Sequence, residues 1–192
     1  MTYNQVQEPI ILITGPEFKN TDIGARDTNA AITDTINSAG SEEGEDGWLH
    51  IAGYVFTKDF AAMDELVECI KRGTKTRIVI NRLLKKHVPD GKKDNNTGRD
   101  MLLKLNRDYT NVELYSFKSS SGDGDLHAKT IVANRNRAVV GSANFSVGGL
   151  DKNYELGLYV TGNTAYNLAL FVDSIANNSN LCTPITKKNE LE

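Results

Sequence analysis

The chain has 192 residues, a formal net charge of −3 and a sequence pI of about 5.7. Hydrophobic residues make up 39% and charged residues 24% of the chain, which excludes a fibrous or wholly disordered protein and fits a single well-buried core. The acidic balance also excludes a generic basic nucleic-acid binder, so any contact with nucleic acid has to come from a local patch.

The cysteines and the N-terminal segment indicate the compartment. Cys69 and Cys182 lie far apart and form no CxxC pair, so we expect two reduced thiols and neither a disulfide framework nor a zinc site. The N-terminal segment lacks a basic region, and its apolar run from Ile10 to Ile13 is too short for a signal peptide or a membrane span. We therefore expect a soluble, cytoplasmic protein with no membrane partner.

The first half of the chain alternates strand and helix patterns. Strands are predicted over residues 9–14, 48–56 and 75–81, helices over 27–39 and 59–73, and an acidic loop over 41–47. Trp48, Tyr54 and Phe56 are expected to pack in the core. The order strand, helix, strand between residues 48 and 81 favours parallel pairing.

The second half begins with a basic loop over residues 83–98. A helix is predicted over 99–107 and a final helix over 163–177, with strands over 112–117, 127–133, 138–142 and 156–160 and a flexible connection over 118–125. The pattern predicts one α/β domain over residues 1–178, a sandwich with a central mixed β-sheet flanked by helices on both faces, followed by a frayed polar tail over 179–192.

Two side chains in the strand predicted over 127–133 carry the first chemical signal. His127 and Lys129 are one residue apart, so a strand would direct both to the same face. Lysine is almost never buried without a partner, and the pair makes sense if an anion binds there. Lys129 would supply fixed positive charge, and His127 a nucleophile or proton carrier near neutral pH.

Two further polar groups follow the histidine and lysine. Gly141-Ser142-Ala143-Asn144 ends the next apolar strand, and both Ser142 and Asn144 can donate hydrogen bonds to phosphate oxygens. Asn153-Tyr154-Glu155 precedes the strand over 156–160, where a carboxylate could orient His127.

Together these motifs resemble the phospholipase D superfamily, whose signature is His-x-Lys, four residues, Asp, and then Gly-Ser-x-Asn. The resemblance covers residues 126–160, and the α/β pattern upstream is compatible with it. It implies a phospholipase D-like fold in which His127 attacks phosphorus and forms a phosphohistidine. Lys129 and Asn144 would bind the phosphoryl oxygens, and Glu155 would hydrogen-bond to His127. It implies no metal and no cofactor, and Ser142, Asn134 and Asn153 would bind phosphate or support the site.

One position departs from the signature. The expected aspartate is Asn134, which keeps the size and the hydrogen bonding of aspartate but loses its charge. In the family this residue is a structural support more than a nucleophile or an acid. The loss of this charge is relevant to the level of enzymatic activity.

The mechanism that the resemblance implies needs two histidines, a nucleophile and a general acid for the leaving group. This chain has one motif, and its other histidines, His50 and His87, lack the His-x-Lys context. The simplest resolution is a homodimer through the motif face, with His127 of each subunit across a two-fold axis.

Single-motif proteins of this size resemble the nuclease branch of the superfamily. The leading expectation is a dimeric, metal-independent endonuclease that acts on DNA in restriction or defence. The basic loop would contact the phosphate backbone through Lys85, Lys86, His87, Lys92 and Lys93. The alternatives are an enzyme that hydrolyses phospholipids or transfers phosphatidyl groups, and a catalytically silent module that binds nucleic acid or dimerises.

Overall fold

A computed structural model describes residues 8–15, 25–40, 47–118, 124–186 and 189. The strands within these residues form one sheet in the order β2-β1-β8-β7-β6-β3-β4-β5-β9. They are β1 (Ile10–Thr14), β2 (Arg26–Asp27), β3 (Trp48–Gly53), β4 (Lys75–Asn81), β5 (Val112–Phe117), β6 (Thr130–Ala133), β7 (Arg137–Gly141), β8 (Glu155–Thr161) and β9 (Cys182–Pro184). Most of the loops predicted over 41–47 and 118–125, namely residues 41–46 and 119–123, lie outside the described residues.

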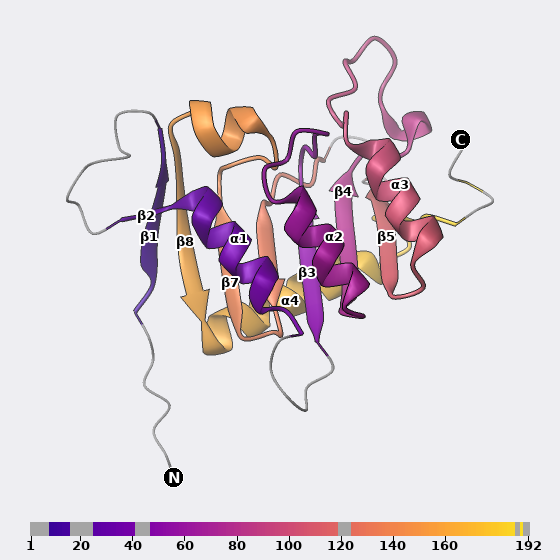
Figure 1. Cartoon of the computed structure of the whole chain (residues 1–192). Helices are drawn as coiled ribbons and strands as arrows, with labels where there is room; N and C mark the ends of the chain where they lie inside the picture. The colour runs from indigo at the N-terminus through magenta and orange to yellow at the C-terminus, as the bar shows by residue number, and fades with distance from the viewer. Residues whose placement is uncertain (1–7, 16–24, 41–46, 119–123, 187–188, 190–192) are drawn as a thin grey trace.

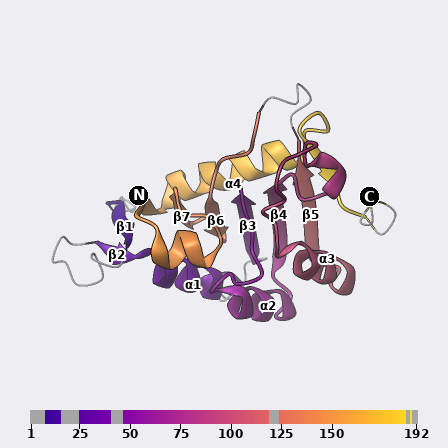
Figure 2. The same cartoon turned by 90° about the horizontal axis from the view of Figure 1, so that it is seen from above.

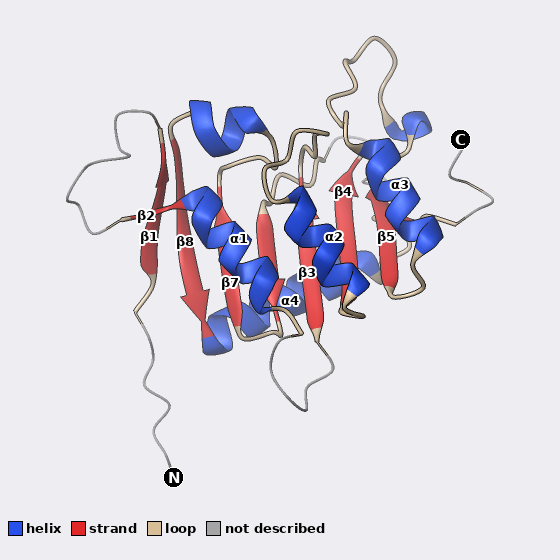
Figure 3. Ribbon diagram, viewed as in Figure 1, coloured by secondary structure: helices blue, strands red, loops and turns tan. Residues whose placement is uncertain are grey.

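Helices cover both faces of this sheet. Helices α1 (Thr28–Ser38), α2 (Met63–Lys71) and α3 (Arg99–Asp108) lie on one face and α4 (Gly162–Ala176) lies on the other (Figure 1 and Figure 2). The arrangement confirms the predicted α/β sandwich with a mixed central sheet. Figure 3 shows the same layers by secondary structure, with a short π-helical turn at Gly148–Lys152 between β7 and β8.

The sheet has a parallel half and an antiparallel half. Strands β3, β4 and β5 pair in parallel, as the strand-helix-strand order predicted. Strands β6, β7, β8 and β1 pair antiparallel in succession, and β6 joins the halves because it pairs antiparallel with β3. The end of β3 therefore lies at the same edge of the sheet as the beginning of β6.

The strand that was predicted over residues 127–133 begins only at Thr130. Pairing with β3 ends at Ala52 and Thr130, and β3 itself ends at Gly53, so His127 lies beyond the last residue of that strand. The backbone near Lys129 still follows β7, since the Lys129 carbonyl accepts a hydrogen bond from the Gly141 N–H at 3.1 Å. His127 and Lys129 thus lie at the edge of the sheet and not within it.

The frayed tail predicted from residue 179 is not what the structure shows for Cys182–Pro184. These residues form β9, which pairs antiparallel with β5 at Phe117 and Cys182. The Ile185 N–H donates to the Leu114 carbonyl at 2.8 Å, and the Ile185 side chain is buried. The sequence signal for this strand is the apolar set Leu181, Cys182 and Ile185 within an otherwise polar segment.

Candidate functional site

Four of the predicted site residues, His127, Lys129, Ser142 and Glu155, gather at one edge of the sheet, where β3, β4 and β7 end and β6 and β8 begin. His127 and Lys129 precede β6, Ser142 follows β7, and Glu155 opens β8. Ligand sites in sheets with parallel strands are common beyond the carboxyl ends of those strands. The sheet thus brings residues that are far apart in sequence to one edge.

His127 and Lys129 are in direct contact. The Lys129 Nζ lies 2.9 Å from His127 Nδ1 and donates to the His127 carbonyl oxygen at 2.8 Å. His127 is exposed, whereas only 3% of Lys129 is accessible to solvent. Burial lowers the pKa of Lys129, and the negative charge of Glu155 opposes this shift. No carboxylate among the described residues forms an ion pair with Lys129, so its charge remains available to an anion.

Tyr54 is a site residue that the sequence prediction placed in the core. Its ring is half-buried and packs against the His127 ring, with centroids 4.6 Å apart. The Lys129 Nζ lies 5.3 Å from the centroid of the same ring, a favourable cation–π distance. By contrast, Phe56 is fully buried, as predicted, and packs against Phe60 and Phe145.

Glu155 is held by two neighbours other than His127. The Ser142 hydroxyl donates to the Glu155 carboxylate, and the Asn153 side-chain amide donates to it at 3.2 Å. Ser142 Oγ also accepts from the Leu156 N–H at 3.2 Å. Ser142 and Asn153 thus hold Glu155, and neither of these bonds involves His127, the partner expected for Glu155. The negative charge of Glu155 raises the pKa of Lys129.

Asn144 presents an unused polar group. Its Oδ1 is buried and makes no hydrogen bond within the part of the chain that the structure describes. The turn around it is tight, because a Cβ at Gly149 would lie only 2.4 Å from the Asn144 carbonyl oxygen. The Phe145 N–H donates to the Val55 carbonyl at 3.3 Å, which ties the turn to the chain beside Tyr54. Because Oδ1 is an acceptor, a ligand at this atom has to donate a hydrogen bond, whereas the Nδ2 of the same amide can donate to a phosphate oxygen.

Asn134 lies at the opposite edge of the sheet, so the prediction that it binds phosphate is wrong and only its supporting role remains. Its side-chain oxygen accepts from the N–H groups of Gly40 and Trp48 at 3.1 and 3.4 Å, and its amide donates to the Ser38 carbonyl at 3.0 Å. Asn134 and Arg135 both have positive φ, 50° and 54°, as a type I′ hairpin turn requires. Asparagine is favoured in that conformation.

The basic loop separates into two parts. Lys85, Lys86, Lys92 and Lys93 are exposed, in agreement with a surface patch. His87 is buried, so the prediction that it contacts nucleic acid is wrong. The Ser116 hydroxyl lies 2.8 Å from His87 Nδ1, and burial, with the charges of Lys118 and Lys86, lowers the pKa of His87 to about 4.

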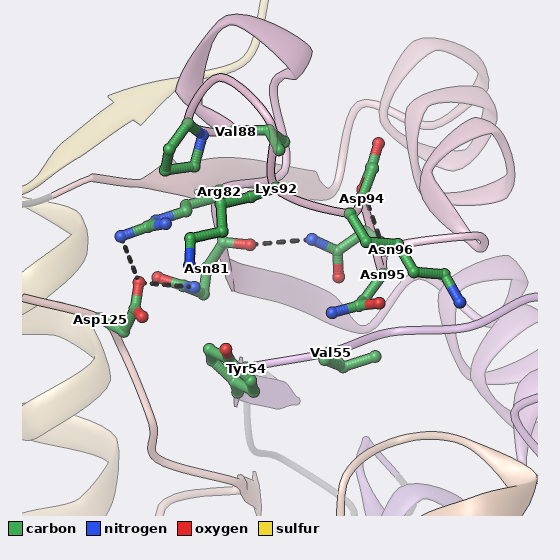
Figure 4. Close-up of a pocket in the computed structure, with 12 residues that line it drawn as sticks. Tyr54, Val55, Asn81, Arg82, Val88, Lys92, Asp94, Asn95, Asn96 and Asp125 are labelled. Carbon is green, nitrogen blue, oxygen red and sulfur yellow. Dashed lines mark hydrogen bonds and ion pairs between the residues drawn. The ribbon is translucent and has the colours of Figure 1, made fainter.

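Asn81 was not predicted as a site residue, yet it positions the segment that carries His127. It ends β4, and its Oδ1 accepts from the Leu126 N–H at 3.0 Å. Its side-chain amide donates to Asp125 at 3.1 Å. A pocket of about 370 Å³ lies beside these contacts and is also lined by Tyr54, Lys92 and Lys93 (Figure 4).

No group of three or more His, Cys, Asp or Glu side chains among the described residues is arranged to hold a metal ion. No helix there is both long enough and apolar enough to cross a membrane.

Comparisons with known proteins show the family of the chain. Residues 32–170 match the family of the cardiolipin synthase, PLD-like domain. The DISARM protein DrmC of Bacillus paralicheniformis is 26% identical over 160 residues, which are 83% of this chain and 60% of DrmC. This chain therefore spans about 60% of the length of that relative.

Solved structures share the fold at low sequence identity. NucT from Helicobacter pylori has a TM-score of 0.65 and 18% identity, with 93% of this chain and 100% of NucT covered. Nuc from Salmonella typhimurium, a phospholipase D family member, has a TM-score of 0.61 and 21% identity, with 94% and 100% covered. Phosphatidylserine synthase from Haemophilus influenzae has a TM-score of 0.67 and 13% identity, with 96% and 41% covered. The chain belongs to the phospholipase D superfamily.

Proposed function

We propose that this protein is an endonuclease that cleaves DNA phosphodiester bonds through a covalent phosphohistidine at His127. The observation that carries the proposal is the contact between a buried, unpaired Lys129 and an exposed His127. A buried cation is costly unless an anion pairs with it. A phosphodiester supplies that anion and places phosphorus beside the imidazole.

The reaction has two steps. A ring nitrogen of His127 attacks phosphorus, the N–P bond forms as one P–O bond breaks, and a second histidine protonates the departing oxygen. Water then attacks the phosphohistidine, gives its proton to the second histidine, and releases His127. Lys129 and the Asn144 side chain stabilise the charge on the non-bridging oxygens.

The second histidine comes from a partner subunit in this proposal. His50 is fully buried on the face of the sheet that α4 covers, with its Nε2 3.1 Å from Asp173, and burial lowers its pKa to about 4. His87 is buried as well. Neither can protonate a leaving group beside His127, whereas His127 of the partner subunit can do so across a two-fold axis.

An exposed apolar strip beside Glu155 supports the dimer. Tyr154 and Leu156 flank Glu155 and are 59% and 65% exposed. Leu158 and Ile11 are exposed and pair directly across β8 and β1. Such a strip at the rim of a half-complete site favours a second copy of the same chain as its occupant.

The relatives suggest a biological setting. NucT and Nuc share the fold, and DrmC carries the name of a DISARM protein. We therefore place the proposed nuclease in a cytoplasmic defence system.

Incubation of plasmid and single-stranded DNA with the purified protein in excess EDTA tests the proposal. We expect cleavage by the wild type and none by His127→Ala, while His87→Ala, the variant of a buried histidine outside the site, still cuts. Binding of DNA without cleavage would favour a silent binding module. Hydrolysis of phosphatidylcholine vesicles with no action on DNA would favour a lipid enzyme.

A further inference from the structure

The pocket beside His127 has the size of a small-ligand site. Its volume of about 370 Å³ falls within the range of about 300–1,000 Å³ that is usual for such sites. It lies between the ends of β3 and β4 and the segment over residues 88–96 (Figure 4). Tyr54 belongs both to its lining and to the contact with His127, so the pocket and the reacting centre are adjacent.

The lining combines apolar surface with one unused amide. Tyr54, Val55, Val88 and Pro89 supply the apolar part. The Asn95 carboxamide faces the same space as Tyr54 (Figure 4) and makes no hydrogen bond to any side chain or backbone group that the structure describes. An amide can both donate to and accept from the edge of a nucleobase.

The two neighbouring asparagines are already engaged. Asn96 accepts from the Phe56 N–H at 3.0 Å and donates to the Asn81 carbonyl at 2.9 Å. Asn81 holds Asp125 and Leu126. These two residues form the frame of the pocket, whereas the Asn95 side chain is exposed and can exchange water for a ligand.

The charges at the pocket favour a phosphate-bearing ligand. Asp125 pairs with Arg82 at 2.9 Å and Asp94 pairs with Arg99, so both lining carboxylates are neutralised. Lys92 and Lys93 also line the pocket, and neither forms an ion pair within the described ranges.

Arg82, which also lines the pocket, has a strained backbone conformation. Its φ of 49° is uncommon for a residue other than glycine. The Arg82 N–H donates to the Phe117 carbonyl at 2.8 Å, which holds the conformation. Strained positions of this kind are concentrated at ligand sites.

We propose that this pocket binds the unpaired base of the nucleotide next to the scissile phosphate, and that Asn95 reads that base. The inference rests on the proposed nuclease function. Tyr54 stacks on the base, Asn95 contacts its edge, and Lys92 and Lys93 bind the neighbouring phosphate. A base within a duplex cannot enter such a pocket, so the strand is single or the base is flipped out.

A binding experiment tests the pocket without cleavage. His127→Ala protein is mixed with a single-stranded oligonucleotide in which 2-aminopurine replaces one base at a time. We expect the fluorescence to change strongly at one position, where the base stacks on Tyr54. Asn95→Ala in the same background should remove that response, and Asn167→Ala, an exposed asparagine on α4, should keep it.

A cleavage experiment measures specificity. On randomised single-stranded DNA the wild type should prefer one base beside the cut, and Asn95→Ala should weaken that preference about tenfold. Cleavage with the same preference in Asn95→Ala, or oligonucleotide binding without a responsive position, overturns the pocket inference and leaves the nuclease proposal standing. A wild type that neither binds nor cuts any nucleic acid overturns both.

Discussion

Asn81 Oδ1 accepts a hydrogen bond from the backbone N–H of Leu126 at 3.0 Å, and this bond fixes the chain one residue before His127. Asn81 ends a parallel strand, whereas Leu126 leads into an antiparallel one. The bond therefore joins the two halves of the sheet at the point where His127, the proposed nucleophile, is held.

Asn81→Ala tests this positioning role. The variant leaves the Leu126 N–H without an acceptor, and a displacement of about 1 Å at a reacting group costs on the order of a hundredfold in rate. We expect kcat on DNA to fall between about tenfold and a hundredfold with little change in KM. In the double variant Asn81→Asp with Asp125→Asn, donor and acceptor exchange places, and kcat should partly recover. A kcat equal to that of the wild type in Asn81→Ala would contradict the role.

Lys129→Met separates stability from activity. The folded state lowers the pKa of Lys129 by burial, so the charged form destabilises the fold at neutral pH. We expect the urea midpoint of Lys129→Met to equal or exceed that of the wild type while kcat falls by a factor of about 100 to 1,000. Lys104→Met, on the exposed surface of α3, should change neither quantity. In the alkaline range, activity of the wild type should decline at a lower pH than it would if Lys129 had the pKa of an ordinary lysine.

Asn134→Asp restores the residue that the family signature has. It keeps the acceptor for Gly40 and Trp48 but loses the donor to the Ser38 carbonyl, at a cost of about 1 kcal/mol in the free energy of unfolding. Because Asn134 lies at the edge opposite His127, kcat per folded molecule should not change. A several-fold rise in kcat would show that position 134 acts on the site.

The buried His87 predicts how stability depends on pH. Its pKa is about 4 in the folded state against 6.5 for the free side chain, so its stabilising effect is complete above about pH 6.5 and is lost as the pH falls toward 4. Between pH 7 and pH 5 this amounts to about 2 kcal/mol. Urea unfolding at the two pH values should show a smaller difference for His87→Gln than for the wild type. Asn167→Ala, at an exposed asparagine of α4 that does not titrate, should keep the wild-type difference.

Leu158→Asp tests the dimer. A charge within the exposed strip of β8 should yield monomers in sedimentation and remove nuclease activity, since each site then lacks its second histidine. Leu170→Asp, at a similarly exposed leucine of α4, should remain a dimer and stay active. Full activity in a monomeric Leu158→Asp variant would contradict the proposal that two subunits form the site.

The sequence predicted those parts of the fold and site that are local. The apolar spacing of residues 63–71 and the alternation of strands and helices follow from short-range periodicity, and the histidine-lysine and Gly-Ser-x-Asn motifs each span a few residues. Contacts across the sheet could not be read in this way. Tyr54 packs against His127, and Asn81 bonds to the two residues before it, only because β6, β3 and β4 lie next to one another in the sheet. Because His87 lies among lysines in the sequence, it was predicted to contact nucleic acid from an exposed loop. In the structure it is buried and lies against Ser116.

The division of the sheet into a parallel and an antiparallel half bears on how the protein is made. Tyr54 and Asn81 come from the first half, whereas Ser142 and Glu155 arrive with β7 and β8, which are synthesised later. A chain still on the ribosome can expose His127 long before β8 has emerged to pair with β7 and β1. If the protein cuts DNA as proposed, prematurely terminated or proteolytically shortened copies that lack β8 carry the nucleophile but no assembled site, and so pose no danger to the chromosome of the cell that makes them.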